Sequence, residues 1–229
     1  MVLEILFEDD FYIAINKPAG LLVHKTKLAK DEVPVFAMQL LRDQIGQWVY
    51  PLHRIDRPTS GILLFAKSPE AAALLQPEFA TTNIKKYYLT VVRGIPAEDH
   101  FIIDHPLRKD LDGTLQDCKT EFWKLAETEI PFASTPKYPT SRYALLKAYP
   151  LTGRMHQIRR HLAHARHYII GDSTHGETRQ NKFFREKFGL NNLLLHAARL
   201  EFKHPVFNEK IIISAPIPEY FQKIMNEIL

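Results

Sequence analysis

The chain has 229 residues, 45% of them hydrophobic and 24% charged, with a formal net charge of +4, which is the composition of a globular protein able to bury a sizeable core. Its one cysteine, Cys118, excludes an intramolecular disulfide and is typical of a reducing compartment. The acidic start MVLEILFEDD is not a secretory signal, and no apolar run approaches the roughly 20 residues of a membrane helix, so we expect a cytoplasmic protein rather than a membrane protein.

Strands and helices alternate irregularly along the chain. Strands are predicted at 5–7, 11–15, 86–94, 119–125, 141–149, 193–195 and 211–213. Helices are predicted at 35–44, after Ser68-Pro69-Glu70, at 154–165 and at the C-terminal end. The clearest helix is 154–165, where Met155, Ile158, Leu162 and Ala165 form one apolar stripe.

Strand pairs joined by short turns favour an α+β fold with a mixed, largely antiparallel sheet over a doubly wound parallel sheet. Residues 95–140 are rich in proline and are expected to be mostly loop. We find neither an internal repeat nor a linker, so residues 1–229 are expected to form a single domain.

Positive charge is concentrated in one segment. Between Leu151 and Leu190, eight arginines and lysines stand against three acidic residues, and five histidines lie in the same stretch. A local excess of this kind indicates a polyanion site, such as one for a nucleic-acid backbone. A solvated helix face would give the same count, so both interpretations remain open on the charge alone.

Metal-dependent and covalent hydrolysis are both poorly supported. The histidines lie among arginines that would repel a cation, and there is neither an H-E-x-x-H motif nor a cysteine pair, so no metal site is predicted. Ser60 lies outside any G-x-S-x-G motif and follows a proline turn, where its hydroxyl is expected to bond the turn. The phosphate-cradling loop of nucleotide hydrolases is absent, and no cofactor motif is present.

Asp56 is the strongest candidate for a chemical role. A carboxylate is a competent nucleophile toward a sugar carbon or an electrophilic ring, and a fixed cation is needed to keep it charged when a substrate displaces water. Arg54 and Arg57 are too close in sequence for both to face Asp56 in an extended stretch. Arg159, at the edge of the predicted helix, is the better partner. These residues alone are explained at least as well by an ion pair that ties the loop to the helix.

Several motifs, in the same order across nearly the whole chain, resemble the pseudouridine synthases of the RluA type. Residues 53–61 resemble the central motif H-R-L-D-x-x-T-S-G, with Ile55 in place of the usual leucine. Further matches are the opening segments 5–10 and 16–24, the K-x-Y strand at 86–94, the T-G-R-x-H-Q-I-R-x-H-L motif at 152–162, and the segments 169–172 and 194–197. The resemblance implies the family's α+β fold, with a mixed, largely antiparallel sheet and flanking helices.

The resemblance also implies the reaction. A uridine in RNA is isomerised to pseudouridine: the bond from N1 to C1′ breaks, the ring rotates, and C5 is joined to the same sugar carbon, with no cofactor. The target base must first be flipped out of its stack. By this resemblance Asp56 attacks the sugar or the uracil, or assists departure of the base. Arg159 pairs with Asp56, and Tyr88 stacks on the uracil and accepts the C5 proton; the alternative for Tyr88 is a core aromatic.

RNA contacts follow from the same resemblance. Arg54 is expected to fill the gap that the flipped base leaves. Further RNA contacts are expected from His53, Arg154, His156, Arg160 and Arg166. Residues 42–47, 138–143 and 171–176 are most similar to the family's short, tRNA-modifying members, so tRNA is the expected partner and no obligate protein partner is inferred. The chain starts at the first strand of the catalytic domain, so no N-terminal S4-type RNA-binding domain is expected. Ribosomal RNA is the alternative substrate, and an RNA-binding or folding factor without turnover is a third possibility.

Overall fold

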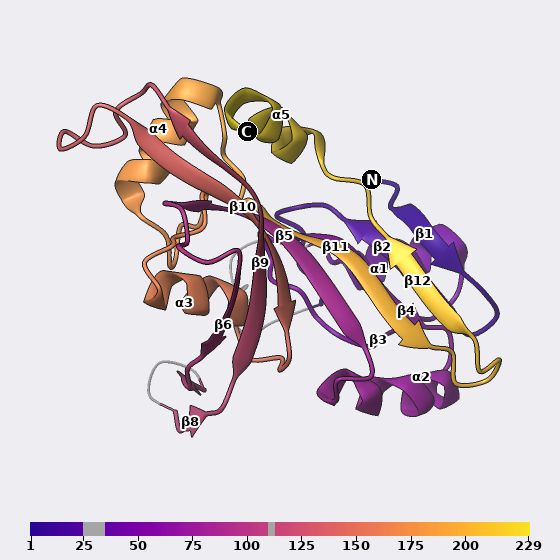
Figure 1. The fold of residues 1–229 in the computed structure, drawn as a ribbon. Helices are drawn as coiled ribbons and strands as arrows, with labels where there is room; N and C mark the ends of the chain where they lie inside the picture. The colour runs from indigo at the N-terminus through magenta and orange to yellow at the C-terminus, as the bar shows by residue number, and fades with distance from the viewer. Residues whose placement is uncertain (25–34, 110–112) are drawn as a thin grey trace. The chain divides into compact units, whose positions relative to one another are not determined.

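The computed structural model describes residues 1–24, 35–109 and 113–229 (Figure 1). The chain divides into two compact units, one of Met1–Lys86 with Ala197–Pro216 and one of Tyr87–His196 with Ile217–Leu229. The expectations of a single catalytic domain and of no S4-type domain stay predictions. None of the helices in the described ranges combines the length and the apolar character that a membrane span requires.

The first unit is a twisted sheet with one helix on each face. Its strands are β1 (Glu4–Glu8), β2 (Tyr12–Lys17), β3 (Tyr50–Pro51), β4 (Ser60–Ala66), most of β11 (Leu195–Lys203) and β12 (Lys210–Ser214). Its helices are α1 (Ala37–Ile45), α2 (Pro69–Leu75) and the 3₁₀ helix η1 (Gln76–Ala80). β1 pairs with β2, β2 with β4, β3 with β4, and β11 with β12, all antiparallel.

Alternation along the strands explains the two cores of this unit. Tyr12 and Ala14 of β2 pack with α2, whereas Ile13 and Ile15 pack with α1. Successive side chains of a strand point to opposite faces, so a run that is apolar throughout, as here, is buried on both sides. The hydroxyl of Ser68 accepts a hydrogen bond from the Ala71 N–H and begins α2, as the sequence predicts.

The second unit is an antiparallel sheet in the order β5-β10-β9-β6. Its strands are β5 (Lys85–Arg93, from Tyr87 on), β6 (His100–Asp104), β9 (Lys119–Ile130) and β10 (Ser141–Pro150), with β7 (Leu107–Arg108) and β8 (Leu115–Gln116) as a separate hairpin. Its helices are α3 (Gln157–His164), α4 (Thr178–Phe188) and α5 (Glu219–Ile228).

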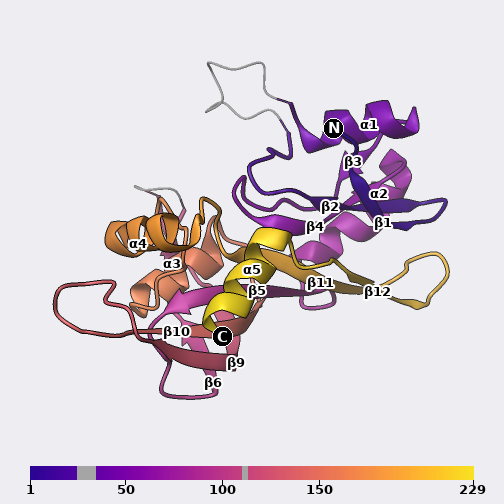
Figure 2. The ribbon, with the colours of Figure 1, turned by 90° about the horizontal axis from the view of Figure 1, so that it is seen from above.

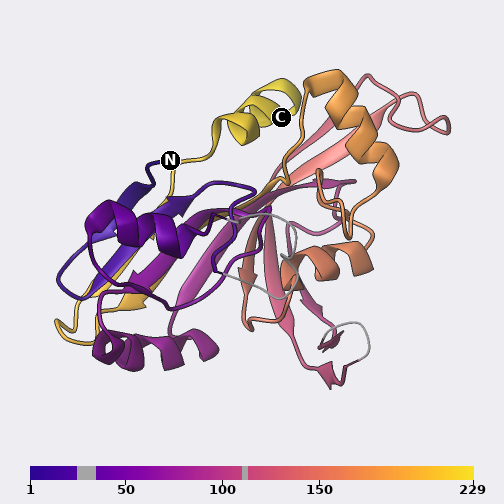
Figure 3. The ribbon, with the colours of Figure 1, turned by 180° about the vertical axis from the view of Figure 1, so that it is seen from behind.

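The same alternation sorts the helices of the second unit. Val92 and its same-face neighbours pack with α3. Figure 3 shows α3 and the strands of this unit from behind. Val91, on the other face, packs in the cluster that contains α4 and α5, and Figure 2 shows α5 lying over β5 and β10. Residues 95–140, expected to be mostly loop, instead contain four strands in their described part. The α+β fold with a largely antiparallel sheet and flanking helices is confirmed.

Candidate active site

Asp56 lies in the irregular segment between β3 and β4, in the first unit. The side chain of Ile55 is buried and that of Asp56 is half-buried, whereas Arg54 and Arg57 on either side are exposed. The Thr59 N–H donates to the Asp56 carbonyl at 3.0 Å and closes a turn that leads into β4. The sequence interpretation that the neighbouring arginines do not both face Asp56 stays a prediction.

Gly61 allows β4 to start directly after this turn. Its φ of +106° is a conformation that side chains rarely adopt, and a Cβ there would lie 2.2 Å from the carbonyl oxygen of Ala197 in β11. Only glycine permits this close approach of the two backbones, so the T-S-G end of the motif has a structural reason.

A fully buried lysine joins the Asp56 segment to the N-terminal turn. Lys17 ends β2, and its Nζ donates to the carbonyls of Pro18 and Leu21, both at 2.9 Å, and to that of Arg57 at 3.2 Å. Arg57 completes the link: its carbonyl accepts from the Gly20 N–H at 2.8 Å, and its Nε donates to the Gly20 carbonyl at 3.0 Å. Burial lowers the pKa of Lys17 to about 7, with the Asp56 carboxylate opposing the shift. Lys17 therefore positions the segment that carries Asp56, a role that sequence reasoning missed.

We expect Lys17→Met to lower the free energy of unfolding by about 3 kcal/mol at pH 7, because it leaves three part-buried carbonyls without their donor. Between pH 7 and about 10.5 the unfolded chain holds a proton on this lysine that the folded chain has lost. The native protein therefore gains stability from this group as the pH rises through that window, and the variant should lack this gain. Urea unfolding at several pH values measures both effects.

The matched control is Lys67→Met. Lys67 lies in the same unit and bonds the exposed Glu8 at 2.7 Å, so its loss should change stability by no more than about 1 kcal/mol. Equal stability changes in the two variants would contradict the positioning role of Lys17.

Arg159 lies in α3 of the second unit and is 3% exposed. Its Nε donates to Oδ2 of Asp172 at 2.7 Å and its Nη2 to Oδ1 at 2.8 Å, a bidentate pair that fixes the plane of the guanidinium. Burial alone would raise the pKa of the Asp172 carboxyl, but its hydrogen bonds from Arg159 and from the N–H groups of His175 and Thr174 hold the pKa below its ordinary value. Sequence reasoning missed the pairing of Asp172 with Arg159, and the pairing of Arg159 with Asp56 stays a prediction.

The turn that carries Asp172 is itself fastened to α4. Asn181 accepts from the Gly171 N–H at 2.9 Å and donates from Nδ2 to the Asp172 carbonyl at 2.8 Å. A Cβ on Gly171, whose φ is +82°, would lie 2.0 Å from the Asn192 carbonyl oxygen. The Gly171-Asp172 match in the sequence therefore reflects a tight turn whose carboxylate orients Arg159.

Tyr88 lies in β5, half-buried, opposite Ala148 of β10. It packs against the core cluster that includes Ile158 and Leu162 of α3, so it shares a face of the second unit with the helix that carries Arg159. Tyr87 instead contacts the ring of Tyr149, with ring centroids 5.2 Å apart. The alternation that separates Tyr88 from Tyr87 in the sequence analysis agrees with these contacts.

Most of the chain matches a known protein family. Residues 11–164, which contain all three candidate catalytic residues, match the family model described as RNA pseudouridylate synthase. The chain belongs to the RNA pseudouridylate synthase family. Two relatives, both tRNA pseudouridine synthase C, come from Vibrio parahaemolyticus and Haemophilus ducreyi. The first is 46% identical (98% of this chain, 94% of the relative) and the second 48% identical (99% and 96%).

Solved structures of the RNA pseudouridylate synthase fold are also similar. Human RNA Pseudouridylate Synthase Domain Containing 4 matches with a TM-score of 0.76 over 97% of this chain and 92% of that chain. Human RNA Pseudouridylate Synthase Domain Containing 1 matches with a TM-score of 0.74 over 94% and 84%. Both are 22% identical, so they establish the shared fold.

In this pseudouridylate synthase the residues expected to contact RNA lie in different settings. Arg54 and Arg154 are exposed. Arg160 is half-buried, and its Nη1 donates to the Arg108 carbonyl at 2.9 Å. His156 precedes α3 in a left-handed conformation, φ 53°, with its Nδ1 2.9 Å from Nε2 of His175. Their RNA contacts stay predictions, and Arg166 is described below.

His53 is held within the fold. Its Nε2 accepts a hydrogen bond from the Leu64 N–H at 3.1 Å, and its ring stacks on Phe79 with centroids 4.7 Å apart. Burial, with the nearby Lys86 charge, lowers the pKa of His53 to about 3. His53 therefore supports the start of the motif as a neutral ring, and the RNA contact expected of it is untested.

The other histidines of the basic segment are engaged in protein contacts. His161 is fully buried, with Nδ1 2.8 Å from the Thr120 hydroxyl and Nε2 3.0 Å from the His105 carbonyl. His164 stacks on His105 with centroids 3.8 Å apart. Among the described residues, no three histidine, cysteine, aspartate or glutamate side chains are grouped so as to hold a metal ion.

Proposed function

We propose that this protein isomerises a specific uridine of tRNA to pseudouridine, with Asp56 as the essential carboxylate. The observation that carries the proposal is the similarity over nearly the full chain, at 44–48% identity, to relatives that are each a tRNA pseudouridine synthase C. The family segment contains Asp56, a half-buried carboxylate on a turn held by Lys17, which supports this assignment.

The reaction assigns a task to each candidate residue. The target uridine flips out of its stack. Asp56 attacks C1′ or the uracil ring, or assists departure of the base, and Arg159, held in plane by Asp172, keeps the carboxylate charged and oriented. The N1–C1′ bond breaks and a C5–C1′ bond forms. C5 loses its proton to Tyr88, directly or by relay, and N1 gains a proton, so the atoms balance without a co-reactant.

The proposed substrate is tested by mapping pseudouridine by mass spectrometry in tRNA and ribosomal RNA from cells that lack this protein. We expect one tRNA uridine to lose the modification, and expression of the wild-type chain to restore it. Loss of a site in ribosomal RNA, with all tRNA sites intact, would contradict the tRNA assignment while leaving the reaction in place. No lost site in either RNA would contradict the reaction itself.

A further inference from the structure

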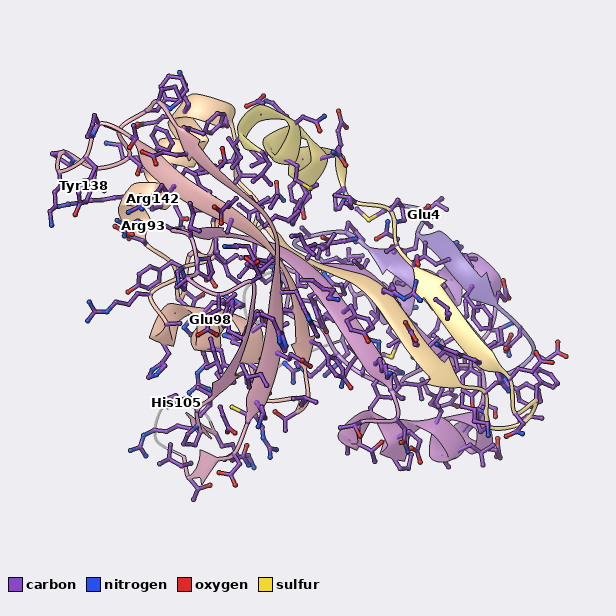
Figure 4. All side chains as sticks on the ribbon, in the orientation of Figure 1. Glu4, Arg93, Glu98, His105, Tyr138 and Arg142 are labelled. Carbon is purple, nitrogen blue, oxygen red and sulfur yellow. The ribbon has the colours of Figure 1, made fainter. Side chains whose placement is uncertain are left out.

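The second unit contains a pocket of about 410 Å³ at the end of its sheet where β5 ends and β10 begins. Its walls come from the end of β5, from the connection between β9 and β10, and from the residues that follow α3. Figure 4 shows Arg93, Arg142 and Tyr138 beside one another at this end of the unit. The volume falls within the range of about 300–1,000 Å³ typical of ligand sites.

The lining of the pocket is positively charged. It includes Arg93, Arg142 and Arg166 against a single carboxylate, that of Glu129. Arg93 is neutralised by Glu177, with Nη1 2.5 Å from Oε2. Within the ranges that the structure describes, neither Arg142 nor Arg166 forms an ion pair, and both are exposed. Two guanidinium groups therefore face solvent at the pocket, a donor arrangement that suits a phosphate.

Hydrogen bonds within the connection between β9 and β10, and from this connection to α4, hold it in place, so the pocket wall is pre-formed. The Ser141 hydroxyl accepts from the Ser134 N–H at 2.9 Å and lies 2.7 Å from the Ser134 hydroxyl. Gln180 of α4 donates to that Ser134 hydroxyl at 2.7 Å and accepts from the buried Tyr143 hydroxyl at 2.9 Å. Tyr138, in the same connection, is 52% exposed, and Nζ of Lys137 lies 5.1 Å from its ring centroid, which leaves the other aromatic face for a ligand.

Arg166 occupies a position where glycine is the ordinary choice. It follows the C-terminal end of α3 with a φ of 60°, and the Arg166 and His167 N–H groups bond back to the carbonyls of Ala163 and Leu162 at 3.0 and 2.8 Å. This left-handed position strains a side chain that glycine would not carry. Strained positions of this kind cluster at functional sites, which favours a role for the guanidinium at this edge of the pocket.

We propose that this pocket binds a nucleotide of the RNA substrate other than the target uridine. Arg142 and Arg166 hold its phosphate, and Tyr138 stacks on its base. A free phosphate would fill only part of the volume and would leave the tyrosine face unused. The proposal rests on the proposed function, because it takes the bound polyanion to be the tRNA on which the enzyme acts.

The test uses Arg142→Gln, Arg166→Gly and Tyr138→Ala in the full-length protein, with an unmodified tRNA transcript. Each arginine variant should raise Kd and KM about tenfold at low salt, with kcat little changed. The slope of log K against log salt should become shallower by about 0.7–0.9 for each lost phosphate contact. Tyr138→Ala should weaken binding about tenfold without changing the slope.

Arg166→Gly also separates binding from folding. Because glycine suits the left-handed position, its thermal midpoint should equal or exceed that of the wild type even as its affinity falls. Arg199→Gln, which removes the same charge from β11 in the first unit, is the control and should leave KM and the salt slope unchanged.

If the wild type forms pseudouridine, either of two results would overturn the pocket assignment and leave the proposed function in place. One is an unchanged KM and salt slope in both pocket arginine variants. The other is a rise in KM in Arg199→Gln equal to the rise in those variants. If the wild type forms none, the proposed function fails, and the tRNA titrations still decide whether the pocket binds RNA.

Discussion

Asp56→Asn is expected to abolish pseudouridine formation, lowering kcat/KM by about 10⁴-fold or more, as removal of a nucleophile does in other enzymes. Asparagine keeps the shape of the side chain but has neither its charge nor its nucleophilic oxygen. The surrounding turn is held by backbone contacts, through the Thr59 N–H and through Lys17 at the Arg57 carbonyl, and these contacts remain in the variant, which should therefore fold.

Affinity for tRNA should be nearly unchanged in this variant, because the base is flipped and bound before any bond breaks. The control is Asp10→Asn, which makes the same change at an exposed turn between β1 and β2 and should leave turnover intact. Substantial turnover by Asp56→Asn would rule out the catalytic assignment. A loss of tRNA binding equal to the loss of rate would give Asp56 a binding role instead.

The second large effect is expected from Asp172→Asn. The amide removes one charge of a buried ion pair and leaves Arg159, 3% exposed, without its bidentate acceptor. Breaking a buried pair in this way typically costs about 3–5 kcal/mol, which urea unfolding measures. Glu186→Gln, which breaks the exposed 3.7 Å contact with Lys182 in α4, should change stability by less than about 1 kcal/mol. A similar small change in Asp172→Asn would contradict the role of this pair.

The ion pair of Asp172 with Arg159 should also make the stability of the fold depend on pH. The pKa of Asp172 is lower in the folded protein than in the unfolded chain, so the unfolded chain takes up a proton first as the pH falls. The contribution of this carboxylate to stability is therefore complete above about pH 4 and is lost as the pH falls through its folded pKa. The wild type should lose this component on acidification, whereas Asp172→Asn should lack it.

Measurements of kcat and of tRNA affinity in Asp172→Asn show whether Asp172 positions Arg159 or only stabilises the fold. Under conditions where Asp172→Asn stays folded, kcat should fall more than tRNA affinity, because Arg159 loses the contact that fixes its plane. Equal losses of kcat and of affinity would mean that Asp172 is needed only for the fold.

The features that could be predicted from the sequence are those set by residues close together in the chain. Asp56 and Tyr88 are assigned from motifs, and strand alternation separates Tyr88 from Tyr87. The fold class follows because paired strands and short turns leave a local pattern. The strand β4 was missed because its residues, Ser60–Ala66, are apolar on both faces and show no alternation.

Partners that lie far apart in the chain leave no such pattern. A lysine next to Pro18-Ala19-Gly20 is expected from the sequence to be solvated, and only the fold brings the carbonyl of Arg57 to its Nζ. Asp172 was matched as a motif residue, but its partnership with Arg159 depends on the turn that Asn181 holds. α4 was missed because Thr178–Phe188 is mostly polar, with few apolar residues to mark a stripe.

The most direct test of uridine isomerisation by Asp56 is release of the C5 hydrogen. A tRNA transcript carrying tritium at C5 of its uridines is incubated with excess enzyme, and tritium in water is counted alongside the intact RNA. We predict release of one tritium per tRNA, with no strand cleavage, and none with Asp56→Asn. No release by the wild type, or equal release by the variant, would contradict the account.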